Sequence, residues 1–295
     1  MSGTILVLGG TGLLGRAVAA ELTRRHRPFE APGRLSFDLI DAGGIASHVD
    51  AFAPAAVINL SGFTDVAAAE RPENLAAATA LNAGVPEVLA RVCSRRAIPF
   101  VHVSTDYVFD GAKTTPYLED DPVRPIQVYG ATKLEGEKRA TAADPRVLIA
   151  RVSTLYGPDR PQRPAYVDAI LAQAQKAAAT GGGALTVVER PVSSPTYAPD
   201  VAPALIDLLD RKATGIVHVV NDGAASRLEL ARAVVATAGF ADRVTVNTRP
   251  EPPNALSRPS YSVLDTGKLQ SLIGRRLPRW EDGLAKYLET SGAKS

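Results

Sequence analysis

Short runs of consecutive apolar residues alternate along this chain with longer segments in which apolar residues recur every three or four positions. The runs predict strands at Thr4–Leu8, Ala56–Asn59, Phe100–Val103, Leu148–Val152, Leu185–Val188 and Ile216–Val220, with a weaker second strand at Pro28–Pro32. Because the runs are continuously apolar rather than alternating, they are typical of a parallel sheet that is covered on both faces.

Helical periodicity fills the intervals between these runs. Leu14, Val18 and Leu22 fall on one face of a helix predicted over Leu14–Arg25, and further helices are predicted over Ala76–Arg95 and Lys133–Thr141. A strand–helix rhythm that starts at the first residues predicts an α/β protein with a Rossmann-type, doubly wound parallel sheet.

The C-terminal part has a different pattern, because two helical segments there are mixed with loops. We expect a smaller C-terminal substrate lobe beside the Rossmann-type sheet. The expected division assigns residues 1–155 and 183–220 to the NAD(P)-binding domain and residues 156–182 and 221–295 to the substrate-binding lobe.

Composition excludes several classes of function. The 33 basic and 31 acidic residues leave a net charge of +2, and no basic stripe is interleaved with aromatic residues, so we expect no nucleic-acid partner. The single cysteine, Cys93, excludes an internal disulfide and fits a reducing cytoplasm. We find no signal peptide, no apolar stretch near the roughly 20 residues of a membrane span, and no metal-ligand spacing. We therefore expect a cytoplasmic protein without a protein-built metal site.

Glycines mark the first turn of the chain. Gly9, Gly12 and Gly15 follow the first strand and open the first helix, which is the context that a dinucleotide-binding turn requires. Gly9 permits the tight turn, Gly12 lets the backbone approach a pyrophosphate, and Gly15 allows close packing of the helix. The helix N-terminus then offers N–H groups to the phosphates.

Other segments are expected at the ribose and adenine ends of the cofactor. Asn59-Leu60-Ser61-Gly62 ends the third strand, at the sheet edge where a ribose would lie. Asp38 and Leu39 are candidates for the adenine end, with a turn-forming role for Asp38 as the alternative. Arg34 follows the weak second strand and favours the 2′-phosphate of NADPH, while NADH stays an alternative.

A second group of residues can move a proton. Tyr129 and Lys133 are four residues apart, so they share a helix face. A tyrosine with a pKa near 10 is a weak acid at neutral pH, and a nearby ammonium is expected to lower that pKa. The tyrosine could then protonate a carbonyl oxygen as hydride reaches its carbon. Thr105 or Ser104, at the end of the preceding strand, would orient that oxygen.

Four motifs give the chain a resemblance to a known family. STDYVFDG (104–111), VYGATKLEGEK (128–138), SSPTYAPDVA (193–202) and RPSYSVLDTGKL (258–269) occur in this order. Together they resemble the dTDP-4-dehydrorhamnose reductases, which are extended short-chain dehydrogenases/reductases. The resemblance extends over nearly the whole chain. It implies a Rossmann domain with a small substrate lobe, and reduction of a 4-keto-6-deoxy sugar nucleotide by NADPH or NADH to give dTDP-L-rhamnose.

The resemblance also implies roles for individual residues. Its implied catalytic set is Thr105, Tyr129 and Lys133. Together with the residues proposed from the motifs, the expected cofactor contacts are Gly9, Gly12, Leu13, Leu14, Gly15, Arg34, Asp38, Leu39, Leu60, Ser61, Gly62, Ser104, Tyr129 and Lys133. The expected substrate contacts are Thr105, Asp106, Tyr107, Thr154 and Arg258, with Arg258 a candidate for a substrate phosphate.

The chain departs from the family pattern on the substrate side. The usual VDxAE is Val66–Glu70 without its aspartate, the usual TSWVYG is STLYG (153–157) without its tryptophan, and the usual CSWYE is ASRLE (225–229). The usual DQxGSPT is ERPVSSPT (189–196). A related sugar nucleotide therefore stays open as the substrate.

Two other functions stay open from the sequence. The same family resembles the regulatory β subunit of methionine adenosyltransferase, which binds a cofactor and a partner enzyme without turnover. A sugar-nucleotide epimerase or dehydratase would use the same scaffold, although Asp106-Tyr107 lacks the glutamate that a dehydratase normally carries. We expect a sugar-nucleotide substrate, and a homodimer is left open as the assembly.

Overall fold

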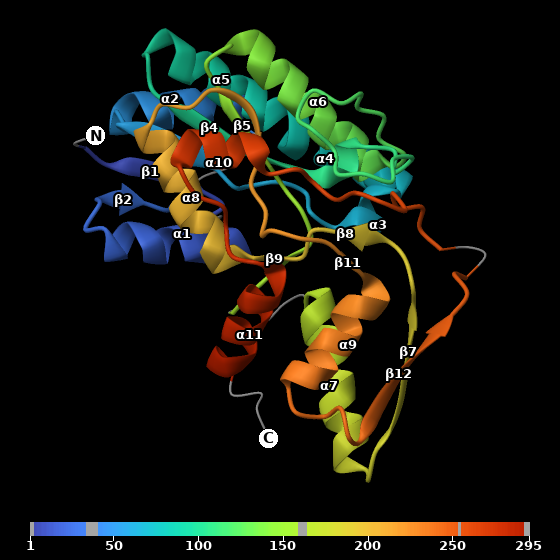
Figure 1. The fold of residues 1–295 in the computed structure, drawn as a ribbon. Helices are drawn as coiled ribbons and strands as arrows, with labels where there is room; N and C mark the ends of the chain where they lie inside the picture. Colours follow the sequence, from blue (N-terminus) through green and yellow to red (C-terminus); the bar gives the residue numbers. More distant parts are fainter. Residues whose placement is uncertain (1–2, 34–40, 159–163, 253–254, 292–295) are drawn as a thin grey trace.

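The structure is a computed structural model of the chain, and it describes residues 3–33, 41–158, 164–252 and 255–291. Its centre is a six-stranded sheet in the order β10-β5-β4-β3-β1-β2, in which all neighbouring strands are parallel (Figure 1). The strands are β1 (Ile5–Leu8), β2 (Phe29–Glu30), β3 (Ala56–Asn59), β4 (Phe100–Thr105), β5 (Leu148–Val152) and β10 (Gly215–His218). The predicted doubly wound sheet is confirmed.

Successive side chains of β1 enter two separate cores, because side chains alternate between the faces of a sheet. Ile5 and Val7 pack with α1 (Leu13–Arg24) and α8 (Ala198–Asp210). Leu6 and Leu8 pack on the other face with α2 (Ala42–Phe52) and α5 (Val85–Arg95), beside which lies α6 (Val128–Ala143). The apolar runs of the sequence are explained by this burial on both faces.

The strand order reverses at β1, which lies between β2 and β3. A sheet of this kind opens a crevice beyond the carboxyl ends of the strands where the order reverses, and ligands bind there. The glycine turn follows β1 and the Leu60–Gly62 segment follows β3, so both lie at this crevice. The backbone N–H of Leu60 donates to the carbonyl oxygen of Leu8 at 2.9 Å and joins the two strand ends.

A smaller lobe has its own core below the sheet in Figure 1. It contains α7 (Tyr166–Ala179), α9 (Arg227–Thr237), α11 (Trp280–Thr290) and the parallel pair β7 (Gly183–Val188) and β12 (Val244–Arg249). The strand at 183–188 was expected in the Rossmann-type sheet, but β7 pairs with β12 instead. An apolar run predicts a strand without saying which partner will pair with it.

Short elements connect the sheet to the lobe. They are α3 (Val66–Ala69), the 3-10 turns Pro72–Asn74 and Asp106–Val108, and the strand pairs β6 (Leu155–Tyr156) with β9 (Thr196–Tyr197) and β8 (Val192–Ser193) with β11 (Ala225–Ser226). The C-terminal segment returns to the large unit through α10 (Gly267–Ile273), whose Leu269 and Ile273 enter the core that α1 and α8 share.

The helix expected over Ala76–Arg95 is interrupted. It consists of α4 (Leu75–Thr79), a π-helical turn (Ala80–Gly84) and α5. Pro86 lies in the first turn of α5 and has no backbone N–H, which explains why regular α-helical bonding cannot continue through it. The π turn directs Asn82 inward, where its side chain bonds Phe63 and Thr132. Such turns are frequent at functional sites.

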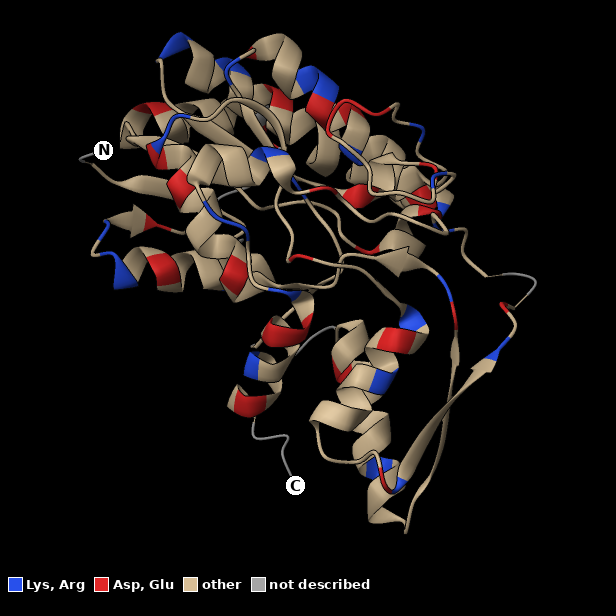
Figure 2. Cartoon of the chain, in the orientation of Figure 1, with Lys and Arg blue, Asp and Glu red and all other residues tan. Residues whose placement is uncertain are grey.

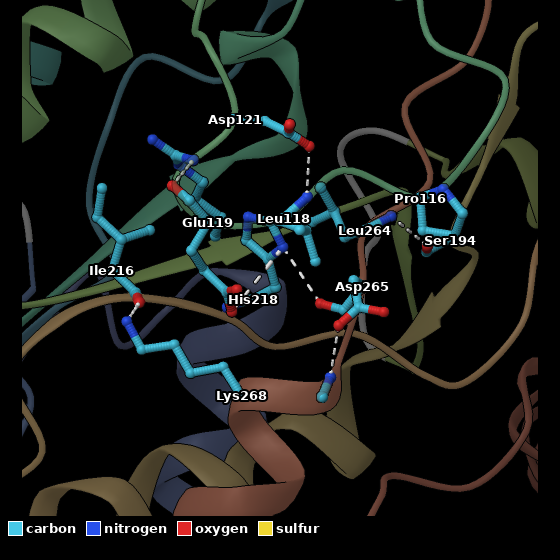
Figure 3. A network of polar contacts seen from close by, with 12 residues as sticks. Pro116, Leu118, Glu119, Asp121, Ser194, Ile216, His218, Leu264, Asp265 and Lys268 are labelled. Carbon is cyan, nitrogen blue, oxygen red and sulfur yellow. Dashed lines mark hydrogen bonds and ion pairs between the residues drawn. The ribbon is translucent and has the colours of Figure 1, made fainter.

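Glu119, His218 and Asp265 join three distant segments (Figure 3). The backbone N–H of His218 donates to Glu119 at 3.0 Å, and the His218 Nδ1 lies 3.2 Å from the carbonyl oxygen of Asp265. Lys268 Nζ donates to the carbonyl oxygen of Ile216 at 2.6 Å. These contacts hold Asp265 and the first turn of α10 against β10.

Acidic and basic residues are mixed on several of the described helices (Figure 2). Figure 2 shows acidic and basic residues interspersed along α1, α6, α9 and α11, in agreement with the net charge of +2. In the part of the chain that the structure describes, no helix has the length and apolar character needed to cross a membrane.

Candidate active site

Thr105, Tyr129 and Lys133 come together as the sequence predicted. Thr105 ends β4, while Tyr129 and Lys133 lie in the first two turns of α6. A cavity of about 340 Å³ opens beside them, between the sheet and the lobe, and Thr105 and Tyr129 line it. The predicted substrate contacts that also line it are Asp106, Tyr107, Thr154 and Arg258. These residues come from four separate segments of the chain, which meet around one cavity.

Tyr129 is held as a phenol. Burial raises the pKa of its hydroxyl, and the hydrogen bond that it shares with Thr105 opposes this only in part. The sequence analysis expected Lys133 to lower the pKa of Tyr129. In the structure Lys133 is not among the groups that shift this pKa, so the expectation is wrong. Lys133 Nζ instead donates to the carbonyl oxygen of Val103 at 2.6 Å, and burial lowers the pKa of Lys133 to about 8. A protonated tyrosine is the form that a general acid requires.

Asp106 is buried at the floor of the cavity. Its carboxylate accepts hydrogen bonds from Ser262 at 2.6 Å, Ser153 at 2.8 Å and Thr105 at 3.1 Å. Burial raises the pKa of Asp106 to about 6, although the three hydroxyl donors oppose this. Because the donors come from three segments, the carboxylate fixes the position of Thr105 relative to both lobes.

Two carboxylates anchor α6, the helix that carries Tyr129. Glu137 forms a buried two-point ion pair with Arg151 of β5, at 2.9 and 2.7 Å. Glu70 accepts a hydrogen bond from the backbone N–H of Val128 at 2.7 Å and so satisfies the first turn of the helix. Both ends of the catalytic segment are thereby fixed.

The glycine turn fits a bound pyrophosphate. Gly9 has φ +79°, and a Cβ there would lie 2.7 Å from the backbone nitrogen of Ser61. A Cβ at Gly15 would overlap the carbonyl oxygen of Gly9, so Gly15 packs against the turn itself. A Cβ at Gly12 would meet only that oxygen, at 3.3 Å. Helix α1 begins there without a side-chain cap or an acidic residue in its first turn, so its N–H groups face the crevice.

The other predicted cofactor residues have distinct environments. Leu60, Ser61 and Gly62 form the turn after β3, and Leu13 lies half-buried at the start of α1. Leu14 is different, because its side chain is in the hydrophobic core and only its backbone faces the turn. Ser104 is buried, and within the described residues its hydroxyl has no hydrogen-bond partner. Arg34, Asp38 and Leu39 lie outside the residues that the structure describes.

Thr154 adopts an unusual backbone conformation at the cavity wall. Its φ is +39°, a left-handed value that is rare for a β-branched residue. Its hydroxyl lies 2.8 Å from that of Ser193, and its carbonyl oxygen accepts from the N–H of Thr196 at 3.1 Å. These bonds hold Thr154 in position at the cavity wall, where the family pattern has tryptophan.

The sequence analysis missed Arg227. This residue begins α9, lines the cavity together with Arg258, and stacks its guanidinium over the Tyr166 ring at 5.0 Å. Burial, and then the charge of Arg258, lower the pKa of Arg227. Among the described residues, no carboxylate lies within ion-pair distance of either guanidinium. The only signal in the sequence was the arginine at the tryptophan position of the CSWYE motif.

The described residues contain no group of three or more histidine, cysteine, aspartate or glutamate side chains that could hold a metal ion. A doubly wound sheet with a phosphate-binding turn, beside a buried Tyr129–Lys133 pair, instead defines a class of protein: the nicotinamide-dependent oxidoreductases of the extended short-chain type.

Within that class, the chain belongs to the RmlD substrate binding domain family, whose model matches residues 3–292. It is 35% identical to a dTDP-4-dehydrorhamnose reductase of Mycobacterium tuberculosis, over 96% of this chain and 92% of that protein. It is 34% identical to a probable dTDP-4,6-dihydroxy-2-methyloxan-3-one 4-ketoreductase of Streptomyces antibioticus, over 95% and 92% of the two chains.

A solved structure has the same fold. The dTDP-4-dehydrorhamnose reductase of Bacillus anthracis, determined in complex with NADP, superimposes with a TM-score of 0.89 at 25% identity. The match covers 98% of this chain and 100% of that chain. The family resemblance stated from the four motifs is confirmed.

Proposed function

We propose that this chain uses NADPH to reduce dTDP-4-dehydrorhamnose to dTDP-L-rhamnose. The observation that carries the proposal is the position of Tyr129, a protonated phenol on the wall of a cavity that Thr105, Arg227 and Arg258 also line. The full-length similarity to dTDP-4-dehydrorhamnose reductases supports this function over a regulatory subunit. NADH stays the alternative cofactor.

The residues that would hold the cofactor surround the crevice at β1 and β3. The N–H groups at Leu13 and Leu14 would bind the pyrophosphate, and Ser61, Gly62 and Lys133 would contact the ribose on the nicotinamide side. Arg34 is the expected contact of the 2′-phosphate. A bound nicotinamide supplies a hydride equivalent to the carbonyl carbon of the substrate.

The side chains of the chain supply the proton. Tyr129 donates its hydroxyl proton to the ketone oxygen, so that the C=O bond becomes an alcohol C–O–H and the tyrosine becomes a phenolate. Thr105 orients the same oxygen, and the phenolate regains a proton from solvent. Asp106 holds Thr105 in place through the 3.1 Å hydrogen bond.

Arg227 and Arg258 would bind the diphosphate of the substrate. Two guanidiniums that line one cavity form a site for an anion, and planar guanidiniums suit phosphate oxygens. This arrangement directs the sugar toward Tyr129 and the nucleotide toward the lobe. We propose accordingly that residues 156–182 and 221–295 cover the substrate, together with the strand 183–188.

A second substrate has support from one observation. Thr154 lines the cavity where the family pattern has tryptophan, so the wall beside the sugar differs in shape. The relative from Streptomyces antibioticus is named for 4-keto reduction of another dTDP-linked sugar. A related dTDP-4-keto-deoxy sugar is therefore the alternative substrate.

Absorbance of NADPH, followed with each keto-sugar nucleotide and the purified chain, tests the proposal. We expect oxidation with dTDP-4-dehydrorhamnose that is lost in Tyr129→Phe. If NADPH is oxidised only with another dTDP-keto sugar, that sugar is the substrate instead. If NADPH binds but no keto-sugar nucleotide causes its oxidation, the reductase function is overturned. Sedimentation of the same sample tests whether the chain forms the homodimer that the sequence leaves open, and fractionation of cells tests the predicted cytoplasmic location.

A further inference from the structure

A row of polar side chains extends from Lys133 into the interior of the large unit. Lys133 Nζ lies 3.5 Å from His102 Nε2, and His102 Nδ1 lies 3.2 Å from Asn59 Nδ2. Asn59 and His102 are completely buried at 0% exposure, and Lys133 is 5% exposed. The sequence analysis treated His102 as a core histidine. Its two ring nitrogens nevertheless contact a catalytic lysine on one side and an asparagine on the other.

The orientation of the Asn59 amide is fixed by the chain itself. Its Oδ1 accepts a hydrogen bond from the backbone N–H of Ser61 at 3.1 Å and another from the Ser61 hydroxyl. A backbone N–H can only donate, so the oxygen of the amide must face Ser61. The Nδ2 group must therefore face His102, because the flipped amide would direct two donors at each other.

The amide orientation determines the tautomer of His102. Since Asn59 Nδ2 can only donate, His102 Nδ1 must be the accepting nitrogen without a proton. Burial lowers the pKa of His102 well below its usual value, so the ring is neutral. A neutral imidazole carries one proton, which is then on Nε2, the nitrogen that faces Lys133.

An Nε2–H group is a poor neighbour for an ammonium. It can donate to the lone pair of a neutral amine. The ammonium has no lone pair, and an Nε2–H group offers no acceptor to any of its N–H groups. The distance to His102 agrees with this, because at 3.5 Å it is longer than a charge-assisted bond of about 2.7–2.9 Å. The short bond of Lys133, at 2.6 Å, is the one to the Val103 carbonyl.

The other groups around Lys133 add little compensating charge. Glu137 lies one turn further along α6 and favours the ammonium, but it is paired with Arg151. The π turn contributes the neutral Asn82 and the loop after β3 contributes Gly62. Tyr129, on the same helix, is a neutral phenol. Among the described residues, His102 is therefore the neighbour whose hydrogen-bonding state discriminates between the two forms of Lys133.

We propose that Asn59 and His102 are positioning residues that hold Lys133 toward its neutral amine in the ligand-free protein. Asn59 fixes His102 as the Nε2–H tautomer, and that N–H disfavours the ammonium of Lys133. An ammonium that loses its proton more readily stabilises the Tyr129 phenolate less, so Tyr129 keeps its proton, which is the form that carbonyl reduction uses. The consequence for Tyr129 rests on the proposed reductase function, whereas the tautomer of His102 does not.

Long-range ¹H–¹⁵N correlation spectra of the four histidines test the tautomer directly. His102→Asn assigns the signal by its loss. In the unaltered chain we expect His102 to carry its proton on Nε2 and to have an unprotonated Nδ1 throughout pH 6 to 9. A proton on Nδ1, or a doubly protonated ring, would overturn the proposal without bearing on whether the chain is a reductase.

Asn59→Asp is designed to reverse the tautomer with little change in shape. A carboxylate accepts from Nδ1–H, so Nε2 would become an acceptor and stabilise the Lys133 ammonium. We expect the Nδ1–H tautomer, and a shift of the alkaline limb of kcat/KM for reduction to lower pH by about one unit, because the ammonium lowers the pKa of Tyr129. The coupling between His102 and Tyr129 would be overturned if the tautomer reversed while the alkaline limb of kcat/KM did not move. It would also be overturned if that limb moved to higher pH.

Ser61→Ala is the matched control for the tautomer. It removes the hydroxyl of Ser61 but keeps the backbone N–H that orients Asn59, so the His102 signal should stay that of the Nε2–H form. Reversal of the tautomer in this variant would show that the amide orientation is not fixed as proposed. The unaltered chain and its variants could all fail to turn over any keto sugar while the spectra agree with the expected tautomers. The proposed function would then fail, but the assignment of the His102 tautomer would stand.

Discussion

The rings of Tyr107 and Tyr129 meet edge to face, with centroids 5.9 Å apart and an angle of 80° between their planes. Tyr107 thereby covers one side of the phenol that lines the cavity. Burial raises the pKa of both hydroxyls, so neither ring is charged at neutral pH. The contact places a protonated, half-buried phenol on the cavity wall, where a carbonyl oxygen can reach it.

Tyr129→Phe removes the proton donor and keeps the ring contact with Tyr107. We expect kcat to fall by about 100- to 10,000-fold, the usual contribution of a positioned general acid. Affinity for NADPH, measured by fluorescence titration, should be unchanged because the glycine turn is distant from the hydroxyl. Tyr261→Phe, at a tyrosine outside the cavity lining, should retain full activity. Comparable activity in the Tyr129 variant would exclude this residue as the acid.

The three glycines of the first turn should respond differently to alanine. A methyl group at Gly12 would meet only the carbonyl oxygen of Gly9, at 3.3 Å, so we expect a folded protein with at least about 10-fold weaker NADPH binding. A methyl group at Gly15 would overlap the backbone of the turn, so that variant should lose thermal stability as well.

Gly84→Ala is the control for these substitutions. A Cβ at Gly84 has no neighbouring atom within 4 Å, and its φ of −67° and ψ of −49° are helical. Alanine there should stabilise the fold by up to about 1 kcal/mol without changing NADPH binding. Equal loss of NADPH affinity in the Gly12 and Gly84 variants would contradict a pyrophosphate site at the turn.

Arg227→Gln should weaken substrate binding. The side chain lines the cavity beside Arg258, and loss of a hydrogen bond to a charged group costs about 1.5–3 kcal/mol. We therefore expect kcat/KM for the sugar nucleotide to fall by roughly 10- to 150-fold, mainly through KM. Arg232→Gln, at an exposed arginine on the same helix, should leave both constants unchanged. A fall in kcat at unchanged KM would place Arg227 elsewhere in the reaction.

The sequence predicted the elements that make up the large unit. The strands Ala56–Asn59 and Leu148–Val152 agree with the structure at both ends, since long apolar runs are buried on both faces of the sheet. The meeting of Thr105 with Tyr129 and Lys133 was also predicted, because a strand end and the following helix share one sheet edge.

Partner choice and local distortion were not predictable. β7 was placed in the wrong sheet because its apolar run contains no information about its partner, β12. The π turn before α5 depends on how Asn82 bonds to Phe63, a tertiary contact without a local pattern. Arg227 was missed because only the structure shows that the start of α9 lies beside Arg258.

His218 should make the fold sensitive to acid. Its ring is buried, Nδ1 must donate to the Asp265 carbonyl, and burial lowers its pKa to about 3 from a usual value of 6.5. Between these values the unfolded chain binds a proton that the folded chain does not. The free energy of unfolding should therefore fall as the pH drops below 6.5, by about 1.4 kcal/mol per pH unit for this group, until the pH approaches 3.

Asn at position 218 can replace the Nδ1–H donor but cannot titrate. Urea unfolding of the unaltered chain and of His218→Asn between pH 7 and pH 4 isolates the contribution, because His102 and Asp106 contribute equally to both proteins. The variant will be less stable at pH 7, since it loses ring packing against Phe109. Its stability should nevertheless fall less steeply with acid, so that the two curves converge as the pH decreases. Parallel curves would show that His218 does not stay neutral in the folded protein.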